Sequence, residues 1–247
     1  MTTTVFEPEA NRLDRYFFPG MAILILGTVF LGFARTYFLA GIFKAPLASW
    51  ILHVHGAVFS SWILLLIVQT SLVAADRVDL HRRLGLIGFG LACLMIILGI
   101  LASTDALRRG ASGGFADPRT FFIVPITDIL LFGTLIFFAY RARFNPPAHK
   151  RLVLIATIAL MVAAVARWPF SFIHQTPFWV TELCTYAFLV LLLAYDVWST
   201  GKVHRMTLWA GALLIVVHRV RVPIGETAIW HTFATWVQNL AVSIHRG

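Results

Sequence analysis

LGLIGFGLACLMIILGILA, residues 84–102, is a stretch without a single charged side chain, and it decides the fold class. A helix of about 20 apolar residues crosses the hydrocarbon core of a bilayer, which is about 30 Å thick. The stretch lies in an apolar run, and six comparable runs make seven membrane-spanning helices of an all-α, polytopic transmembrane bundle. The seven runs are 16–40, 48–74, 83–105, 120–141, 150–173, 177–198 and 206–225.

The composition agrees with a membrane protein. Of the 247 residues, 59% are hydrophobic and 13% are charged, and the mean hydropathy is +0.83, whereas soluble proteins are about 45–50% apolar. A net charge of +9 would suggest nucleic-acid binding in a soluble domain. Here most basic residues lie in short loops, so the charge is interpreted as a topology signal. We expect the lipid bilayer as the partner and no nucleic acid.

The connections between the runs are too short to fold separately, so we expect a single transmembrane domain over 1–247. In its last segment, apolar residues recur at helical spacing among polar ones. This pattern predicts an interfacial amphipathic helix, with an eighth crossing as the alternative. The expected parts are an N-terminal cytoplasmic segment at 1–15, the seven-helix bundle at 16–225 and the C-terminal helix at 226–247.

Basic residues outside the membrane core predict the orientation, because they accumulate on the cytoplasmic side. Acidic residues at Glu7, Glu9 and Asp14 replace the positive charges of a cleavable signal, so we expect the first span to be retained. The bias predicts a multi-pass protein of the bacterial inner membrane with a cytoplasmic N-terminus. The inner side would carry Arg12, Arg15, Arg77, Arg82, Arg83, Arg141, Arg143, Lys150, Arg151, Lys202 and Arg205, and the outer side Lys44, Arg108, Arg109, Arg119 and Arg246.

A histidine followed by basic residues opens three of the predicted helices. The motifs are HRRL at 81–84, HKRL at 149–152 and HRM at 204–206. All three helices enter from the same predicted side. We expect the basic side chains to extend to lipid headgroups while each histidine lies near the first helical turn. The alternative is a proton relay, or contact with haem propionates, through the histidines.

Several ionisable residues interrupt the apolar runs. Since bare charge is costly in hydrocarbon, we expect them to face the bundle interior. Counting from the predicted outer helix ends places most of them about 7–12 Å below the outer boundary, which predicts a polar pocket open to the outer face, with Asp105 at its mouth. The alternative is a structural ion-pair network in which Arg35 or Arg167 pairs with Asp128 or Glu182. The residues are Arg35, Asp105, Asp128, Arg167, Glu182, Arg219 and Arg221, with His53, His55 and His218.

Three kinds of ligand suit this set. His55 and His218 could ligate a haem b whose propionates contact arginines. A quinone or other amphiphile would use a histidine and an acid for proton exchange. A metal ion could bind His55, Asp128 and His218, although no two of them have an i, i+4 spacing. The candidate cofactor-binding residues are His53, His55, His218, Arg35, Arg167 and Arg219.

The function classes that remain open are a redox or cofactor-binding protein, an ion or small-anion binding, sensing or transport protein, and an accessory subunit of a larger membrane complex or homo-oligomer. The sequence carries no nucleophile elbow, phosphate-binding loop or zinc-protease helix motif, so it does not indicate which enzyme activity, if any, the chain has.

Three motifs carry a family resemblance. LHVHG at 52–56, VDLHRRLG at 78–85 and HKRL at 149–152, followed by Ala166-Arg167, are similar to a family of bacterial seven-helix membrane proteins of unknown function. The resemblance covers most of the chain and implies the fold and topology, without an activity. The segment that ends in HRRLG also resembles membrane cytochromes that hold haem b between helices, although the repeated histidines here lie at helix starts.

Overall fold

Seven helices of the computed structural model, which describes residues 9–45 and 49–246, are long and apolar enough to cross a membrane. This confirms the predicted all-α bundle. The spans are α1 (Glu9–Phe33) with the π-helix η1 (Ala34–Phe38), α3 (Trp50–Ala74), α4 (Val78–Arg108), α5 (Pro118–Arg141), α6 (Pro146–Ala159) with α7 (Val162–Val165), α9 (Phe178–Thr200) and α10 (Arg205–Gly225). The remaining helices are α2 (Ala40–Phe43), α8 (Ser171–Gln175) and α11 (Ala228–Arg246). Residues 1–8 of the expected N-terminal segment lie outside the described residues.

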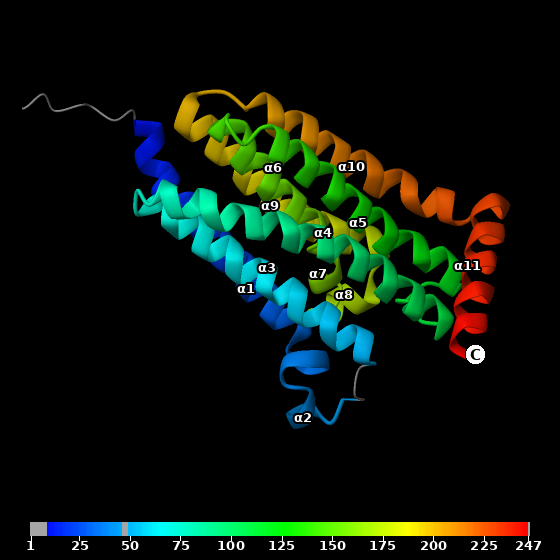
Figure 1. Cartoon of the computed structure of the whole chain (residues 1–247). Coiled ribbons are helices and arrows are strands. Elements are labelled where there is room, and N and C mark those ends of the chain that lie inside the picture. Colours follow the sequence, from blue (N-terminus) through cyan, green and yellow to red (C-terminus); the bar gives the residue numbers. More distant parts are fainter. Residues whose placement is uncertain (1–8, 46–48, 247) are drawn as a thin grey trace, which may run out of the picture.

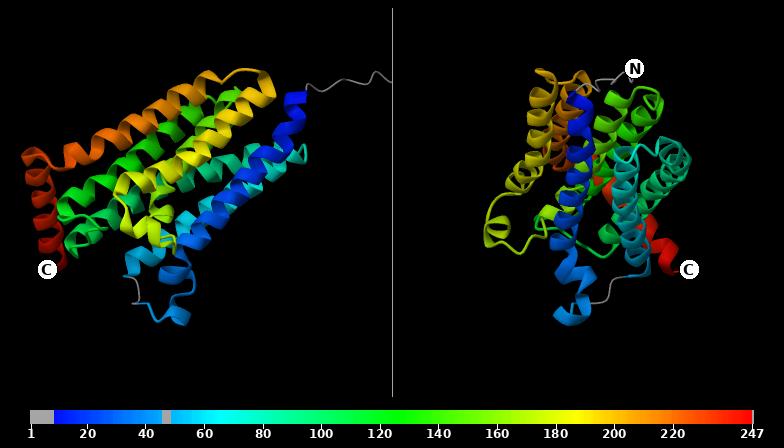
Figure 2. Two further views of the ribbon diagram at one scale, coloured as in Figure 1. Left: turned by 180° about the vertical axis from the view of Figure 1, so that it is seen from behind. Right: turned by 90° about the vertical axis from the view of Figure 1, so that its left-hand side faces the viewer.

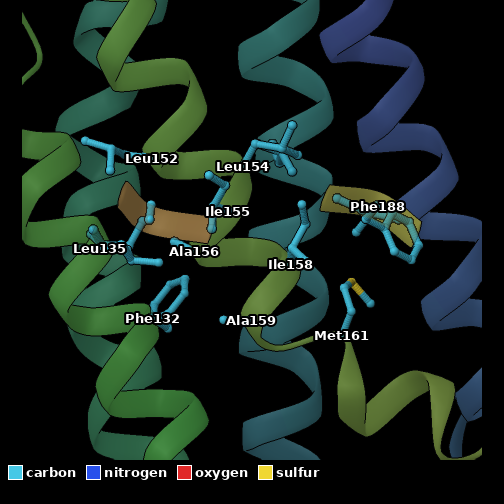
Figure 3. Close-up of a cluster of buried hydrophobic side chains, with 14 of the residues drawn as sticks. Phe132, Leu135, Leu152, Leu154, Ile155, Ala156, Ile158, Ala159, Met161 and Phe188 are labelled. Carbon is cyan, nitrogen blue, oxygen red and sulfur yellow. The ribbon is translucent and has the colours of Figure 1, made fainter. Parts of the chain in front are cut away.

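The core of the bundle is built around α6. This helix contacts α5, α9 and α10, and Leu152, Ile155 and Ile158 on it are at most 1% exposed. Leu152 lies on the side of α6 nearest Leu135 and Phe132 of α5, whereas Ile158 lies on the opposite side of the helix (Figure 3). The other spans run side by side along the long axis of the molecule (Figure 1). Protein therefore surrounds α6 on nearly all sides, as is usual for a helix that is hydrophobic around its whole circumference.

Side-chain caps explain where several helices begin. Asp117 accepts a hydrogen bond from the backbone N–H of Arg119, and Asn145 accepts one from Ala148, each just before a proline in the first turn. His204 caps α10 by accepting from the backbone N–H of Met206 at 3.1 Å. The bond from the Arg119 side chain also lowers the pKa of Asp117 to about 2, which keeps this cap ionised.

The span predicted at 150–173 is shorter than expected. It ends at Val165, and α8 follows as a separate helix. Pro169 lacks a backbone N–H and disfavours helical geometry in the residue before it, so the helix cannot continue. Close packing accompanies the break, because a Cβ on Gly32 of α1 would lie 2.2 Å from the Ala164 carbonyl oxygen.

The C-terminal helix α11 crosses one end of the bundle instead of running along it (Figures 1 and 2). The indole N–H of Trp230 donates to the Arg119 carbonyl at 2.7 Å, and the Gln238 side chain donates to the Leu107 carbonyl at 3.1 Å. Ala234 is fully buried between these contacts. Among the described helices, α11 is not one of those long and apolar enough to cross a membrane. We call this end, with residues 108–118 and 225–228, the α11 end.

Candidate functional site

Three helices bring a charged cluster together in the half of the bundle toward the α11 end. Asp128 comes from α5, Glu182 from α9, and Arg219 and Arg221 from α10. The Arg221 guanidinium donates to Asp128 at 2.5 Å and to Glu182 at 2.8 and 3.1 Å. Arg219 donates to the second Glu182 oxygen at 2.8 Å. We call these four residues, with His218, the charged network.

The members of the charged network differ in how deeply they are buried. Arg221 is fully buried and Glu182 is 2% exposed, whereas 46% of the Arg219 side chain is exposed. The Arg221 guanidinium also lies 5.5 Å from the centre of the Phe178 ring. Two arginines face two carboxylates, so the cluster is close to neutral, which is how charge is accommodated away from water. Only Arg219 reaches the surface of the bundle.

His218 of the charged network and the neighbouring Tyr186 have buried polar atoms without hydrogen bonds among the described residues. His218 is 1% exposed, and its ring is stacked on that of Tyr186 with centroids 5.7 Å apart. Its Nε2 lies 3.4 Å from Asp128, an ion-pair distance without hydrogen-bond geometry. Both ring nitrogens of His218 and the Tyr186 hydroxyl are buried without a hydrogen-bond partner among the described residues. Buried polar groups are nearly always paired, so such a pair indicates a ligand or an ordered water.

The arginines predicted to neutralise Asp128 and Glu182 were assigned wrongly. Arg35 and Arg167 do not pair with these acids, because α10 supplies the closer Arg219 and Arg221. The Arg35 guanidinium lies over the Phe43 ring and that of Arg167 lies over the Phe33 ring. In the described part of the chain, no hydrogen bond or ion pair joins these two arginines to the charged network.

In the described part of the chain, no hydrogen bond or ion pair joins the α3 histidines, His53 and His55, to the charged network or to Asp105. His53 is exposed and its backbone carbonyl accepts from the Tyr37 hydroxyl at 3.1 Å. The His55 ring stacks on Phe59 at 4.1 Å, and its Nδ1 is buried without a partner. Asp105 accepts from Ser49 and pairs with Arg108 and Arg109 near the end of α4.

The expected three-ligand metal site is not formed. Within the described residues, no group of three or more histidines, cysteines or acids could hold a metal ion. His55 stacks on Phe59 of its own helix, while Asp128 is bound by Arg221. Haem between His55 and His218 also does not fit, because α3 packs on α1 and α4 whereas α10 packs on α5, α6 and α9.

A second buried network lies at the opposite end of the bundle. Asp196 of α9 is fully buried and accepts from the Arg151 guanidinium at 2.6 and 2.9 Å. It also accepts from the Thr207 hydroxyl at 2.6 Å and from the His204 backbone N–H at 3.0 Å. Sequence analysis missed this network and predicted that Arg151 reaches lipid headgroups. The sequence feature that could have indicated this network is Asp196, the second acid of the apolar run that also contains Glu182.

Some of the other basic residues in the repeated motifs are exposed, and others face inward. Arg82 and Arg83 are exposed, as predicted, but Lys150 pairs with Asp14, which also accepts from the Tyr195 hydroxyl. Burial, together with the charge of Arg151, lowers the pKa of His204. The motifs thus tie helix ends together, with some of their charges turned inward.

No match was found when the chain was compared with protein-family models, with curated proteins and with solved structures.

Two hollows on the bundle surface do not involve the charged network. One, of about 350 Å³, is lined by α4 and α5 residues including Ile96 and Phe137. The other, of about 420 Å³, lies between α3 and α4 and includes Leu72 and Arg83. Both are mainly apolar and suit lipid chains. The candidate site is therefore the group of unsatisfied atoms beside the charged network.

Proposed function

We propose that this multi-pass membrane protein binds a membrane-soluble amphiphile of the quinone class at the α9–α10 edge of the charged network. The observation that carries the proposal is the stacked pair of His218 and Tyr186, whose buried polar atoms have no hydrogen-bond partner in the described part of the chain. A headgroup with two carbonyl oxygens would supply the missing hydrogen bonds.

Each neighbouring residue has a role in this proposal. The Tyr186 hydroxyl would donate to one carbonyl oxygen, and a ring nitrogen of His218 would donate to the headgroup. Asp128, 3.4 Å from His218 Nε2, would help to orient the ring. Arg219 would mark the entrance, because its half-exposed guanidinium lies 5.9 Å from the centre of the Tyr186 ring. The apolar tail would remain among lipid chains.

The proposed site leaves the strongest ion pairs intact. Arg221 continues to neutralise Asp128 and Glu182, so a headgroup would gain hydrogen bonds without separating buried charges. Preorganised polar groups lower the free-energy cost of binding, because they need no rearrangement when the ligand arrives. This favours an amphiphile site over a pathway in which ions exchange with the acids.

Binding of decylubiquinone to the protein in lipid nanodiscs tests the proposal. Tyr186→Phe removes only the unpartnered hydroxyl, and we expect it to weaken binding about tenfold, the loss of one hydrogen bond of about 1.4 kcal/mol. Tyr140→Phe is the matched control, since the Tyr140 ring also stacks on a neighbour, Phe89, with centroids 4.5 Å apart. We expect wild-type affinity from this control.

Stability separates a binding role from a structural one. Because the Tyr186 hydroxyl makes no hydrogen bond within residues 9–45 and 49–246, Tyr186→Phe should unfold at the same or a slightly higher denaturant concentration than the wild type. Absence of decylubiquinone binding to the wild type, or equal binding by both variants, would contradict the proposal.

We also propose that the end opposite α11 faces the cytoplasm of a bacterial inner membrane. Exposed basic residues at this end support the assignment under the positive-inside rule. Labelling with a membrane-impermeant maleimide, after replacement of Cys93 and Cys184, tests it. A cysteine at Ala142 should react only in inverted vesicles, and one at Gly114 only in intact cells. The exposed residues are Arg82, Arg83, Arg141, Arg143, Lys202 and Arg205.

A further inference from the structure

Three chain segments meet on another side of the bundle, and their contacts are close. A Cβ on Gly32 of α1 would overlap the Ala164 carbonyl oxygen of α7, so the two backbones touch. The following π-helix η1 presses Tyr37 against α3, because a Cβ on Gly56 would lie 2.8 Å from the Tyr37 ring. Local π-helical turns of this kind occur frequently at functional sites. The end of α7 is thereby held beside α1, next to the start of α3.

Arg167 follows α7 at this junction and has no acidic partner among the described residues. Its guanidinium donates to the Ala163 carbonyl at 2.6 Å, and it lies 4.9 Å from the centre of the Phe33 ring. The side chain is exposed, yet enough protein surrounds the guanidinium to desolvate it. A guanidinium has five N–H donors, and these two contacts leave most of them unused. An uncompensated charge in such surroundings favours an anionic ligand.

Two more polar atoms without partners accompany Arg167. The indole N–H of Trp168, the next residue, is buried and finds no acceptor among the residues that the structure describes. Nδ1 of His55 is also buried without a partner among the described residues, and the next residue, Gly56, lies against the Tyr37 ring of η1. The acids that could neutralise Arg167 are already bound, since Asp128 and Glu182 pair with α10 arginines. Trp168 thus adds an N–H group without an acceptor among the described residues to the unused donors of Arg167.

We propose that Arg167, Trp168 and His55 form a binding site for a phosphate group, carried by a phospholipid headgroup or by a free phosphate ion. Arg167 supplies the charge and a fork of N–H donors that matches a pair of phosphate oxygens. The Trp168 indole donates to a third oxygen, and His55 contacts the remaining one. This site uses different helices from the proposed amphiphile site and does not depend on it.

Two measurements distinguish the sources of the phosphate. Native mass spectrometry, after exchange into detergent with phosphatidylglycerol, should show one retained lipid per protein if the phosphate belongs to a headgroup. Calorimetric titration with inorganic phosphate in phospholipid-free detergent should show saturable binding if the free ion is the ligand. Either kind of binding supports the site if it is weakened in Arg167→Gln and Trp168→Phe but not in the control variant described next.

Three variants distinguish a specific phosphate site from nonspecific attraction between phosphate and any arginine. Arg167→Gln should weaken binding at least about tenfold, because it removes a charge-assisted contact. Trp168→Phe removes the N–H and keeps a ring, and it should weaken binding several-fold without affecting folding. Arg143→Gln is the matched control: the Arg143 guanidinium also bonds a carbonyl of its own helix at 3.1 Å and lies over aromatic rings, at the opposite end.

Three results would overturn the proposal. The first is that the wild type binds neither phosphatidylglycerol nor phosphate. The second is that Arg167→Gln binds as strongly as Arg143→Gln. If Arg167→Gln does not fold, wild-type binding by Trp168→Phe is the third, because this variant keeps the charge and removes only the proposed donor.

Discussion

Replacement of Arg221 by methionine should destabilise the protein more than any other single change in the charged network. Arg221 is fully buried, and it makes one bond to Asp128 and two to Glu182. Methionine fills a similar volume but leaves a buried carboxylate, Asp128, with only His218 at 3.4 Å. Removing one partner of a buried ion pair costs about 3–5 kcal/mol. We expect a loss of this size in the free energy of unfolding.

Arg219→Met is the matched control for this prediction. The two arginines share an acid and a helix, but 46% of the Arg219 side chain is exposed and none of that of Arg221. Arg219 is half-exposed, and Glu182 keeps its two bonds from Arg221 when Arg219 is replaced. Arg219→Met should therefore change stability by only about 0–1 kcal/mol. Adding Asp128→Asn to Arg221→Met should recover about 2 kcal/mol, because the unpaired charge is removed.

Unfolding in mixed micelles with increasing sodium dodecyl sulfate, followed by tryptophan fluorescence, measures these differences. The order predicted is wild type, Arg219→Met, then the Asp128→Asn/Arg221→Met pair, and last Arg221→Met alone. Equal stability of the two arginine variants would refute the reasoning, since burial would then not determine the contribution of these ion pairs. A double variant no more stable than Arg221→Met would refute it equally.

Three further predictions concern the opposite end of the bundle and the helix junctions. Asp196→Asn should lower the free energy of unfolding by about 2–4 kcal/mol in the same assay, because it weakens a fully buried acceptor for Arg151. The pKa of His204 lies below its ordinary 6.5, so stability should be full above pH 6.5 and fall as the pH drops through the folded-state value, a dependence that His204→Asn should reduce while keeping the cap. Gly32→Ala should destabilise by at least about 1–3 kcal/mol, because the added methyl would overlap the Ala164 carbonyl, and thermal unfolding would show the shift.

Most of the fold could be predicted from hydropathy alone, because hydrocarbon requires long helices with few charges. The seven spans follow from this requirement, and the amphipathic pattern of 226–247 distinguished α11 from them. The break after Val165 was harder to predict. The apolar run continues through Trp168-Pro169, so the proline, and not hydropathy, sets the end of the span.

The candidate site could be predicted only in part. The cost of buried charge identified residues that need partners, namely Asp128, Glu182, His218, Arg219 and Arg221. It could not say which arginine pairs with which acid, since pairing depends on the order in which helices pack. The same limit explains the error over Arg151, whose position at a helix start suggested lipid contact although its side chain turns inward to Asp196.

A cryo-EM structure of the protein in nanodiscs with decylubiquinone, using an antibody fragment to aid alignment, tests the central claim most directly. The account predicts ring-shaped density within hydrogen-bond distance of the Tyr186 hydroxyl and a His218 ring nitrogen, with Arg221 still bound to Asp128 and Glu182. Density confined to other parts of the bundle, with both groups satisfied by protein atoms alone, would contradict it.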